Sequence, residues 1–221
     1  MTLRALAFAW IALLYILFSL AGGGCGGPSS RPPQIVTESE YQDTLDRARQ
    51  LSEGPIRKHD AREPLDSQEK SDLQEAARLI EGLANFKPTN FATHFLAGKV
   101  YQALGDHERA KIKLKECLST LAPGSQDENI RHMEAEALAL LALSLERTGV
   151  VEEALAAAEE ALKLYPDNPN YLAAKASALI QMGKPEEAHR AVREALARDP
   201  RHARALQLDR LLHSQGEEPH S

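Results

Sequence analysis

Two stretches of the sequence, GVVEEALAAAEEALKLYP at residues 149–166 and GKPEEAHRAVREALARDP at residues 183–200, are near copies of each other. Both open with glycine, continue to Glu-Glu-Ala, contain a later Glu-Ala-Leu and close on proline, and their first residues lie 34 positions apart. A fixed period in this range is typical of stacked repeats, in which each unit buries the apolar face that its neighbour exposes. The repeat therefore decides the fold class before any single helix is considered.

Each repeat has the pattern of two helices. Leu138, Leu141 and Leu145 recur at the spacing of one helix face. Gly149 is expected to end this helix, because glycine tolerates the left-handed backbone of a tight exit. Pro166 ends the next helix, because proline cannot continue a helix beyond its first turn. A stripe of small residues lets the second helix lie close against the first, and it consists of Ala154, Ala158 and Ala161.

This arrangement resembles the tetratricopeptide repeat family, whose unit is also 34 residues long. In that family, small residues occupy three fixed places of the unit and proline a fourth. Lys175 departs from the family pattern, which has an apolar residue there, but its aliphatic stem can pack while its ammonium stays in water. The fixed places hold Ala142, Ala154, Ala161 and Pro166 in one unit, and Ala176, Ala188, Ala195 and Pro200 in the next.

Weaker copies flank these two units. The step from Gly105 to Gly149 is 44 residues, ten more than the period, and we expect the surplus to form a longer connection or an extended helix start at residues 124–132. The predicted fold is an all-α, tetratricopeptide-type α-solenoid of about three to four helical hairpins over residues 67–214. Its parts are the repeats at about 91–124, 135–168 and 169–202, a half repeat at 67–90 and a C-terminal capping helix at 203–214.

Two segments border this body. Residues 38–66 are expected to form a partly ordered helical lead-in, in which a helix over 39–51 can pack on the half repeat. Residues 215–221 are expected to form a disordered tail.

The first residues have the pattern of an export signal. MTLR carries one positive charge, and the uncharged apolar run from Ala5 to Ala21 is followed by small residues. As a helix this run would reach about 25 Å, against a hydrocarbon core of about 30 Å, so it could also remain as an uncleaved anchor. We therefore expect residues 1–24 to be an export signal or membrane anchor.

Three outcomes of this segment stay open. Ser19-Leu20-Ala21 offers a signal peptidase site, which would release the protein. The sequence of residues 22–25, Gly-Gly-Gly-Cys, resembles the lipobox of bacterial lipoproteins, although Gly22 stands where leucine is usual, and this resemblance implies lipidation of Cys25. The third outcome is the uncleaved anchor. Residues 25–37 form a flexible linker in each case, and the predicted location is membrane-associated and extracytoplasmic, in the cell envelope.

Composition and motifs give no sign of catalysis. The formal net charge of −6 argues against binding of nucleic acid. The cysteines, Cys25 and Cys117, form no metal-binding pattern, no histidines stand at metal-ligand spacing, and Cys117 fills a small-residue packing place. The glutamates at 152–153 and 186–187 fall at helix starts, where the helix dipole stabilises acids. We predict no catalytic residue, no metal, no cofactor and no enzymatic activity.

The resemblance implies that a partner protein or peptide lies on a concave face lined by the first helix of each hairpin. The predicted function is a non-enzymatic, membrane-tethered scaffold or adaptor. The alternative is an accessory lipoprotein that binds a small molecule or glycan, which requires a deep polar pocket. By position within the repeat, the partner-binding residues are Phe95, Lys99, Gln102, Leu143, Arg147, Ser177, Gln181, Arg204 and Gln207.

Overall fold

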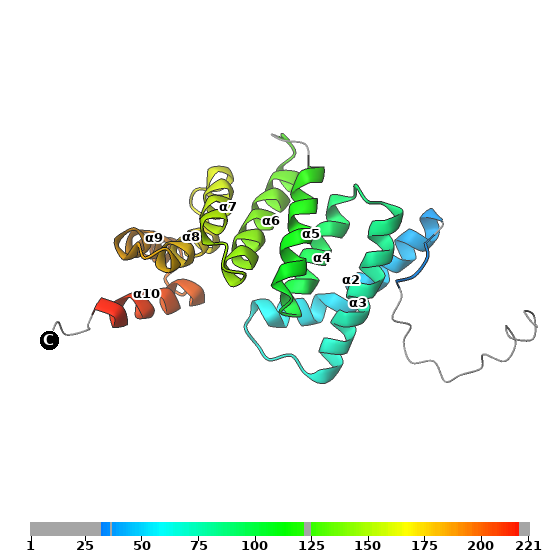
Figure 1. The fold of residues 1–221 in the computed structure, drawn as a ribbon, viewed down its shortest axis with the longest axis horizontal. Helices are drawn as coiled ribbons and strands as arrows, with labels where there is room; N and C mark the ends of the chain where they lie inside the picture. Colours follow the sequence, from blue (N-terminus) through cyan, green and yellow to red (C-terminus); the bar gives the residue numbers. More distant parts are fainter. Residues whose placement is uncertain (1–31, 36, 122–124, 217–221) are drawn as a thin grey trace, which may run out of the picture. The chain divides into compact units, whose positions relative to one another are not determined.

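Helices follow one another in antiparallel pairs along the chain (Figure 1). The structure is a computed structural model that describes residues 32–35, 37–121 and 125–216. These residues contain nine helices and no strand. In chain order the helices are α2 (Glu38–Asp60), α3 (Ser67–Phe86), α4 (Phe91–Ala103), α5 (His107–Thr120), α6 (Glu128–Arg147), α7 (Val151–Leu164), α8 (Pro169–Gln181), α9 (Pro185–Arg198) and α10 (Ala203–Gly216).

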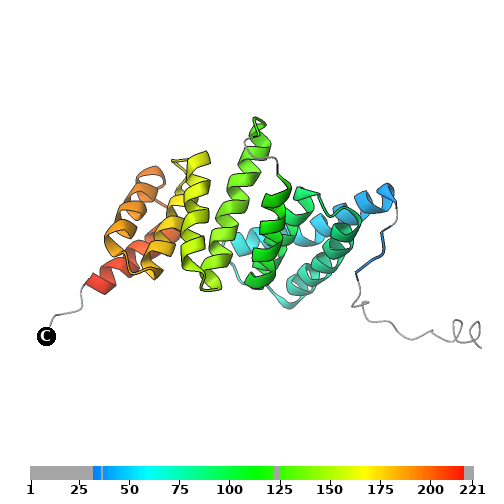
Figure 2. The same cartoon turned by 45° about the horizontal axis from the view of Figure 1, so that its top comes forward.

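Each helix packs most extensively on a neighbour in the chain. The hairpins are α2/α3, α4/α5, α6/α7 and α8/α9, and α10 covers both α8 and α9. Successive hairpins are joined because α5 packs on α6 and α7 packs on α8, while the first helices α4, α6 and α8 also touch one another in order. Figure 2 shows these pairs succeeding one another from α4 to α9. The predicted all-α solenoid with a C-terminal capping helix is confirmed.

Side-chain caps and charges fix where the helices begin. Thr37 and Asp66 each form a capping box, in which the cap side chain accepts from a backbone N–H of the first turn and a glutamate accepts from the cap N–H. No side chain caps α7 or α9, and their first turns carry the glutamates at 152–153 and 186–187. The predicted position of these glutamates at helix starts is confirmed.

The glycine exits adopt the left-handed backbone that the sequence predicts. Gly149 and Gly183 have φ angles of 79° and 70°, and the equivalent Gly105 has 77°. A residue with a Cβ atom loses about 1–2 kcal/mol in this conformation. Arg62, just beyond α2, has a φ of 60° and is the one non-glycine residue with positive φ among those described. Its backbone therefore carries strain that the glycine exits avoid.

Alanines line the helix crossing inside each hairpin. Ala154, Ala158 and Ala161 are at most 1% exposed, which confirms the predicted small-residue stripe of the α6/α7 hairpin. Lys175 is half-buried, and its Nζ lies 3.0 Å from Glu159 of the preceding helix. The core is a series of neighbouring clusters along the helices, so each hairpin depends on the next to complete its interior.

The surplus residues before α6 extend this helix at its start. α6 has 20 residues, whereas α4 and α8 have 13 each. The added turns are held by Tyr165 at the end of α7, whose hydroxyl donates to Glu128 over 2.6 Å and whose ring lies under the Arg131 guanidinium. The prediction of an extended helix start is confirmed.

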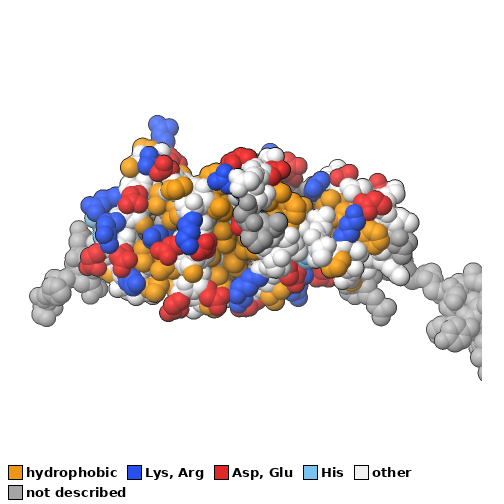
Figure 3. Space-filling view, turned by 90° about the horizontal axis from the view of Figure 1, so that it is seen from above, with side chains coloured by type: hydrophobic (Ala, Val, Ile, Leu, Met, Phe, Trp, Pro, Cys, Tyr) orange, Lys and Arg blue, Asp and Glu red, His pale blue; other side chains and the backbone are white. Residues whose placement is uncertain are grey.

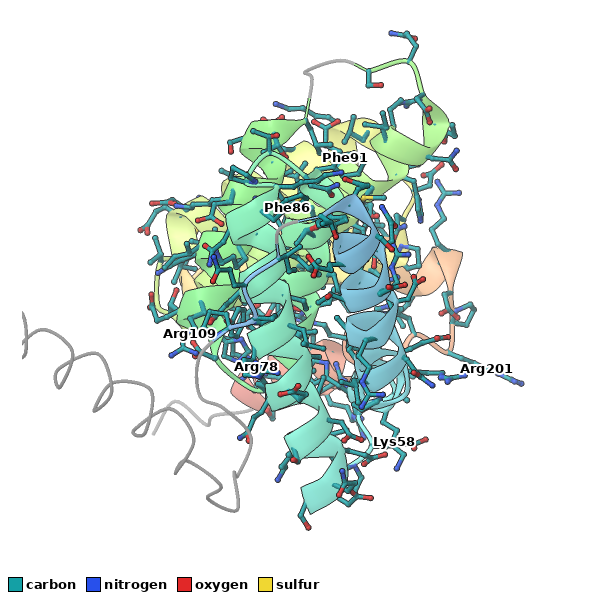
Figure 4. The ribbon with its side chains drawn as sticks, turned by 90° about the vertical axis from the view of Figure 1, so that its right-hand side faces the viewer. Lys58, Arg78, Phe86, Phe91, Arg109 and Arg201 are labelled. Carbon is teal, nitrogen blue, oxygen red and sulfur yellow. The ribbon has the colours of Figure 1, made fainter. Side chains whose placement is uncertain are left out.

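α2 completes the first hairpin. The packing partner expected over residues 39–51 is a longer helix that reaches Asp60, lies along α3 (Figure 4) and places Tyr41 and Leu45 in the core. Lys58 of α2 pairs with Glu69 of α3 at 2.5 Å. Residues 67–90 therefore belong to a full hairpin.

The end of the predicted linker packs against this hairpin. Ile35 is 9% exposed and belongs to the same cluster as Leu83. Pro33 lies over Gly82, where an added methyl carbon would come within 2.6 Å of the Pro33 carbonyl oxygen. Pro33 and Ile35 are therefore part of the packed unit, although they fall within the segment 25–37 that we expected to be flexible.

The predictions for the amino terminus fall largely outside this structure. The export signal or anchor at residues 1–24 and Cys25 lie outside the described residues. Among those that are described, none of the helices combines the length and the apolarity needed to span a membrane.

Candidate functional site

The residues predicted to bind a partner all lie on the first helices of the hairpins or on α10. We call this set the first-helix face. α4 carries Phe95, Lys99 and Gln102; α6 carries Leu143 and Arg147; α8 carries Ser177 and Gln181; α10 carries Arg204 and Gln207. The contacts of α4 with α6, of α6 with α8 and of α8 with α10 make this a continuous set of neighbouring helices.

At the α4 end of the face, a cation lies between an aromatic ring and a carboxylate. Lys99 Nζ is 3.0 Å from Glu136 Oε1 of α6 and 5.7 Å from the centre of the Phe95 ring. All three side chains are half-buried, and Leu143 on α6 is half-buried too. This end therefore offers apolar surface together with a partly shielded ion pair.

Two of the predicted residues take part in helix packing instead. Gln102 is 3% exposed, and its side-chain amide donates to the Leu140 carbonyl over 2.6 Å and to Ser144 Oγ over 2.8 Å. Ser177 is 7% exposed. Because their side chains are buried, neither residue is available to a partner in this conformation.

At the α10 end, an ion pair joins helices that are not neighbours in the chain. Arg204 Nη2 of α10 donates to Glu146 Oε2 of α6 over 2.6 Å, and the two side chains are 21% and 10% exposed. Charges this far from water require their partner, so removal of either one would leave the other uncompensated, at a cost of about 3–5 kcal/mol. The pair holds α10 to α6 past the intervening α8.

The connection after α2 also reaches α10. Arg62 Nη1 donates to Gln207 Oε1 over 2.6 Å, between residues 145 positions apart in the chain. Arg62 is the residue with the strained left-handed backbone. The connection between α2 and α3 is thus joined to α10 by a side-chain hydrogen bond.

Burial and neighbouring charges act together on Arg204 and His202. Burial lowers the pKa of Arg204, Glu146 opposes this change, and the charges of Arg62 and Arg147 lower the pKa further. Burial also lowers the pKa of His202; Asp199 opposes this change, and the positive charges of Arg204 and Arg62 add to it. Burial is therefore the main reason that the charged forms of both groups are disfavoured.

Two residues of the face have no bonded partner within the described chain. Arg147 and Gln181 are exposed, and neither forms a hydrogen bond or ion pair there. With Phe95 and Leu143, they give the face two apolar side chains and two polar ones on α4, α6 and α8.

No arrangement for metal or thiol chemistry is found in the described part of the chain. No group of three histidine, cysteine or acidic side chains there could hold a metal ion. Cys117 is fully buried, and burial raises the pKa of its thiol to about 12. The predicted packing role of Cys117 is confirmed.

Sequence reasoning did not identify Arg62 or Glu146 as members of the site. Arg62 lies in a polar stretch outside the recognisable repeats, and Glu146 is one of many helix-surface acids. A signal for Arg62 was its place at a helix exit, where the clear repeats have glycine. Nothing local marks Glu146, because its partner arrives from α10.

Comparison with known families finds two matching segments. Family models described as "Tetratricopeptide repeat" match residues 91–120 and residues 147–212. These segments contain α4 with α5 and most of α7 to α10. No curated protein sequence matches the chain.

Solved structures with the same fold include two of MamA and one connected with pilF. A crystal structure of MamA protein superposes with a TM-score of 0.62 at 18% identity, covering 81% of this chain and 84% of that one. MamA (41-end) from Desulfovibrio magneticus RS-1 gives 0.58 at 17% identity, with 79% and 86% covered. The structure from a functional characterization of Pseudomonas aeruginosa pilF gives 0.57 at 17% identity, with 80% and 71% covered. At these identities the likeness concerns the fold.

Proposed function

We propose, from the tetratricopeptide repeats that this chain carries, that it is a non-enzymatic scaffold which holds a partner protein or peptide on its first-helix face. Proteins built from such repeats are generally non-enzymatic, and stacked repeats create extended binding surfaces. The observation that best supports this proposal is the composition of the first-helix face. Phe95 and Leu143 are half-buried apolar side chains, while Arg147 and Gln181 are exposed polar side chains that form no hydrogen bond or ion pair with the described residues.

A peptide that crosses α4, α6 and α8 would meet these groups in turn. Apolar side chains on an extended surface anchor a peptide, and unpaired donors beside them orient its polar groups. Gln102 and Ser177 support the surface from beneath, so we leave them out of the direct contacts.

The scaffold is tethered to a membrane in this proposal. Its basis is the sequence of residues 1–25, which combines an uncharged apolar run with a cysteine after small residues. The tether is a lipid on Cys25 or an uncleaved amino-terminal helix, and it holds the repeats in the cell envelope. Mass spectrometry of the mature amino terminus tests this part, because an acylated Cys25 or an intact Met1 supports a tether, whereas a new terminus at Gly22 contradicts it.

Capture of a partner from envelope extracts tests the scaffold role. The full-length chain with a carboxy-terminal tag is compared with Leu143→Glu, which places a charge in the centre of the face. The matched control is Ile112→Glu, because Ile112 is an apolar residue of α5 that is 51% exposed. We expect Leu143→Glu to lose a partner that Ile112→Glu retains. Equal capture by both variants, or capture of nothing above background, would contradict the proposal.

A further inference from the structure

Three arginines converge at the α10 end of the first-helix face. We call Arg62, Arg147 and Arg204 the arginine cluster; they come from the α2–α3 connection, the last turn of α6 and the first turn of α10. Arg62 donates to Gln207, one turn after Arg204 in α10, and Arg204 is paired with Glu146, the residue before Arg147. The charges of Arg62 and Arg147 both lower the pKa of Arg204, while Glu146 opposes them. The cluster forms only in the folded chain, because its members are far apart in sequence.

The charge of this cluster is not balanced. Arg204 is paired with Glu146, Arg62 donates to the neutral amide oxygen of Gln207, and Arg147 has no hydrogen bond or ion pair among the described residues. On the face seen in Figure 3, acidic and basic side chains lie among one another. Among the described residues, Glu146 is the only carboxylate bonded to the three arginines, so two guanidinium groups are left to receive an anion.

The backbone conformation of Arg62 also supports a binding role for the cluster. The exits of α4, α6 and α8 use Gly105, Gly149 and Gly183 at positive φ, and the exit of α2 uses Arg62 in the same backbone region. Glycine would relieve the strain at this position but would remove the guanidinium from the cluster. Strained residues of this kind gather at ligand-binding sites, where the strain keeps a side chain in place.

A histidine next to the cluster supplies an unused polar atom. His107 Nδ1, at the start of α5, is buried and has no hydrogen-bond partner among the described atoms. Burial lowers the pKa of His107; the charges of Arg147 and His59 add to this effect, and those of Asp106 and Glu146 oppose it. Arg147 and Glu146 therefore act on both His107 and Arg204.

We propose that the arginine cluster is a docking site for the carboxylates of an acidic segment in the partner protein. Arg147 and Arg62 supply guanidinium donors to these carboxylates, and Glu146 holds Arg204 in position between α6 and α10. The cluster adjoins Leu143, so one peptide can place an apolar side chain on α6 and acidic side chains beyond it. This inference rests on the proposed scaffold function and adds the chemistry of the partner.

Fluorescence anisotropy with labelled octaglutamate tests the site on the full-length chain. We expect saturable binding that weakens about threefold or more in Arg147→Gln, and that is lost as salt rises from about 0.01 M to about 1 M. The matched control is Arg193→Gln, because Arg193 is an exposed arginine of α9 that has no hydrogen bond or ion pair within the described part of the chain. Absence of binding, or equal weakening by Arg147→Gln and Arg193→Gln, would overturn the proposal. Inorganic phosphate that displaces octaglutamate at equal charge concentration would also overturn it, because the site would then recognise a small anion.

Arg62→Gly separates a docking role from a purely structural one. This change removes the guanidinium and the hydrogen bond to Gln207, but it also removes the backbone strain. We expect weaker octaglutamate binding with no loss in the urea midpoint, whereas unchanged binding with a lowered midpoint would mean that Arg62 only holds α10. A further outcome is that octaglutamate fails to bind while the chain still captures a partner and Leu143→Glu abolishes that capture. This result would reject the docking role of the arginine cluster and leave the scaffold function standing.

Discussion

A methyl group added at Gly98 tests how closely α4 and α5 cross. An alanine Cβ at this position would lie 2.6 Å from both Cγ and Cδ2 of Leu114, whereas ordinary contacts of such atoms are 3.4–4 Å. Leu114 is fully buried, so it cannot swing into solvent to make room. Gly98 occupies the place that holds Ala142 and Ala176 in the clear repeats, which makes it the tightest version of the same crossing.

Two opposing effects set the expected size of the change. Overpacking of a core costs about 1–3 kcal/mol, and alanine gains about 1 kcal/mol over glycine inside a helix. We therefore expect Gly98→Ala to lower the free energy of unfolding by up to about 2 kcal/mol. Gly54 of α2 is the matched control, since a Cβ there meets nothing within 4 Å beyond its chain neighbours. Gly54→Ala should gain at most about 0.5–1 kcal/mol, because the gain in helix propensity is partly offset by contact of the new Cβ with the ring of Pro55.

Urea unfolding of the full-length chain, followed by helical circular dichroism, measures both variants. The difference between them, about 1–3 kcal/mol, measures the clash with Leu114 as a lower limit, because the helix-propensity gain at Gly54 is reduced by Pro55. If Gly98→Ala stabilised the chain as much as Gly54→Ala does, the close α4/α5 crossing would be refuted.

Three further predictions concern other parts of the fold. With Cys25 replaced by serine, Cys117 should react with a thiol reagent at about pH 8 only as fast as the chain unfolds, because burial raises the pKa of its thiol to about 12, and rapid labelling of the folded chain would contradict this. Ala188→Leu should lower the urea midpoint by the equivalent of about 1–3 kcal/mol, and an unchanged midpoint would show that Ala188 lies at no close crossing. Burial lowers the pKa of His202 below its usual 6.5, so the unfolded chain takes up the proton first; this contribution to stability is complete above about pH 6.5 and declines below it. His202→Asn keeps an acceptor for the Ala205 N–H, so it should flatten this decline, and an equal pH slope in both proteins would count against the assignment.

The amino acids that ended and spaced the helices were recognisable because they act locally. Gly149 and Gly183 adopt positive φ as their position in the repeat predicts, and the stripe from Ala154 to Ala161 is buried as its spacing predicts. Such effects depend on residues within a turn or two, so they can be recognised without knowing the neighbours in space.

The candidate site could be predicted only in part. Repeat position correctly assigned Phe95 and Arg147 to first helices, but it could not distinguish the buried Gln102 from the exposed Gln181. The reason is that burial on this face depends on how near the adjacent first helix lies, and Gln102 meets Ser144 of α6. The 34-residue period does not show which side chains contact the next hairpin.

The sequence by itself determined the helical hairpin, its length and its order along the chain, since helix periodicity and glycine exits are properties of short segments. Only the tertiary structure brought Arg62 to Gln207, across 145 positions, and Arg204 to Glu146. These contacts result from the rotations that each hairpin adds to the one before it. Packing sets those rotations, so no local pattern in the sequence shows where the last helix meets the first hairpin.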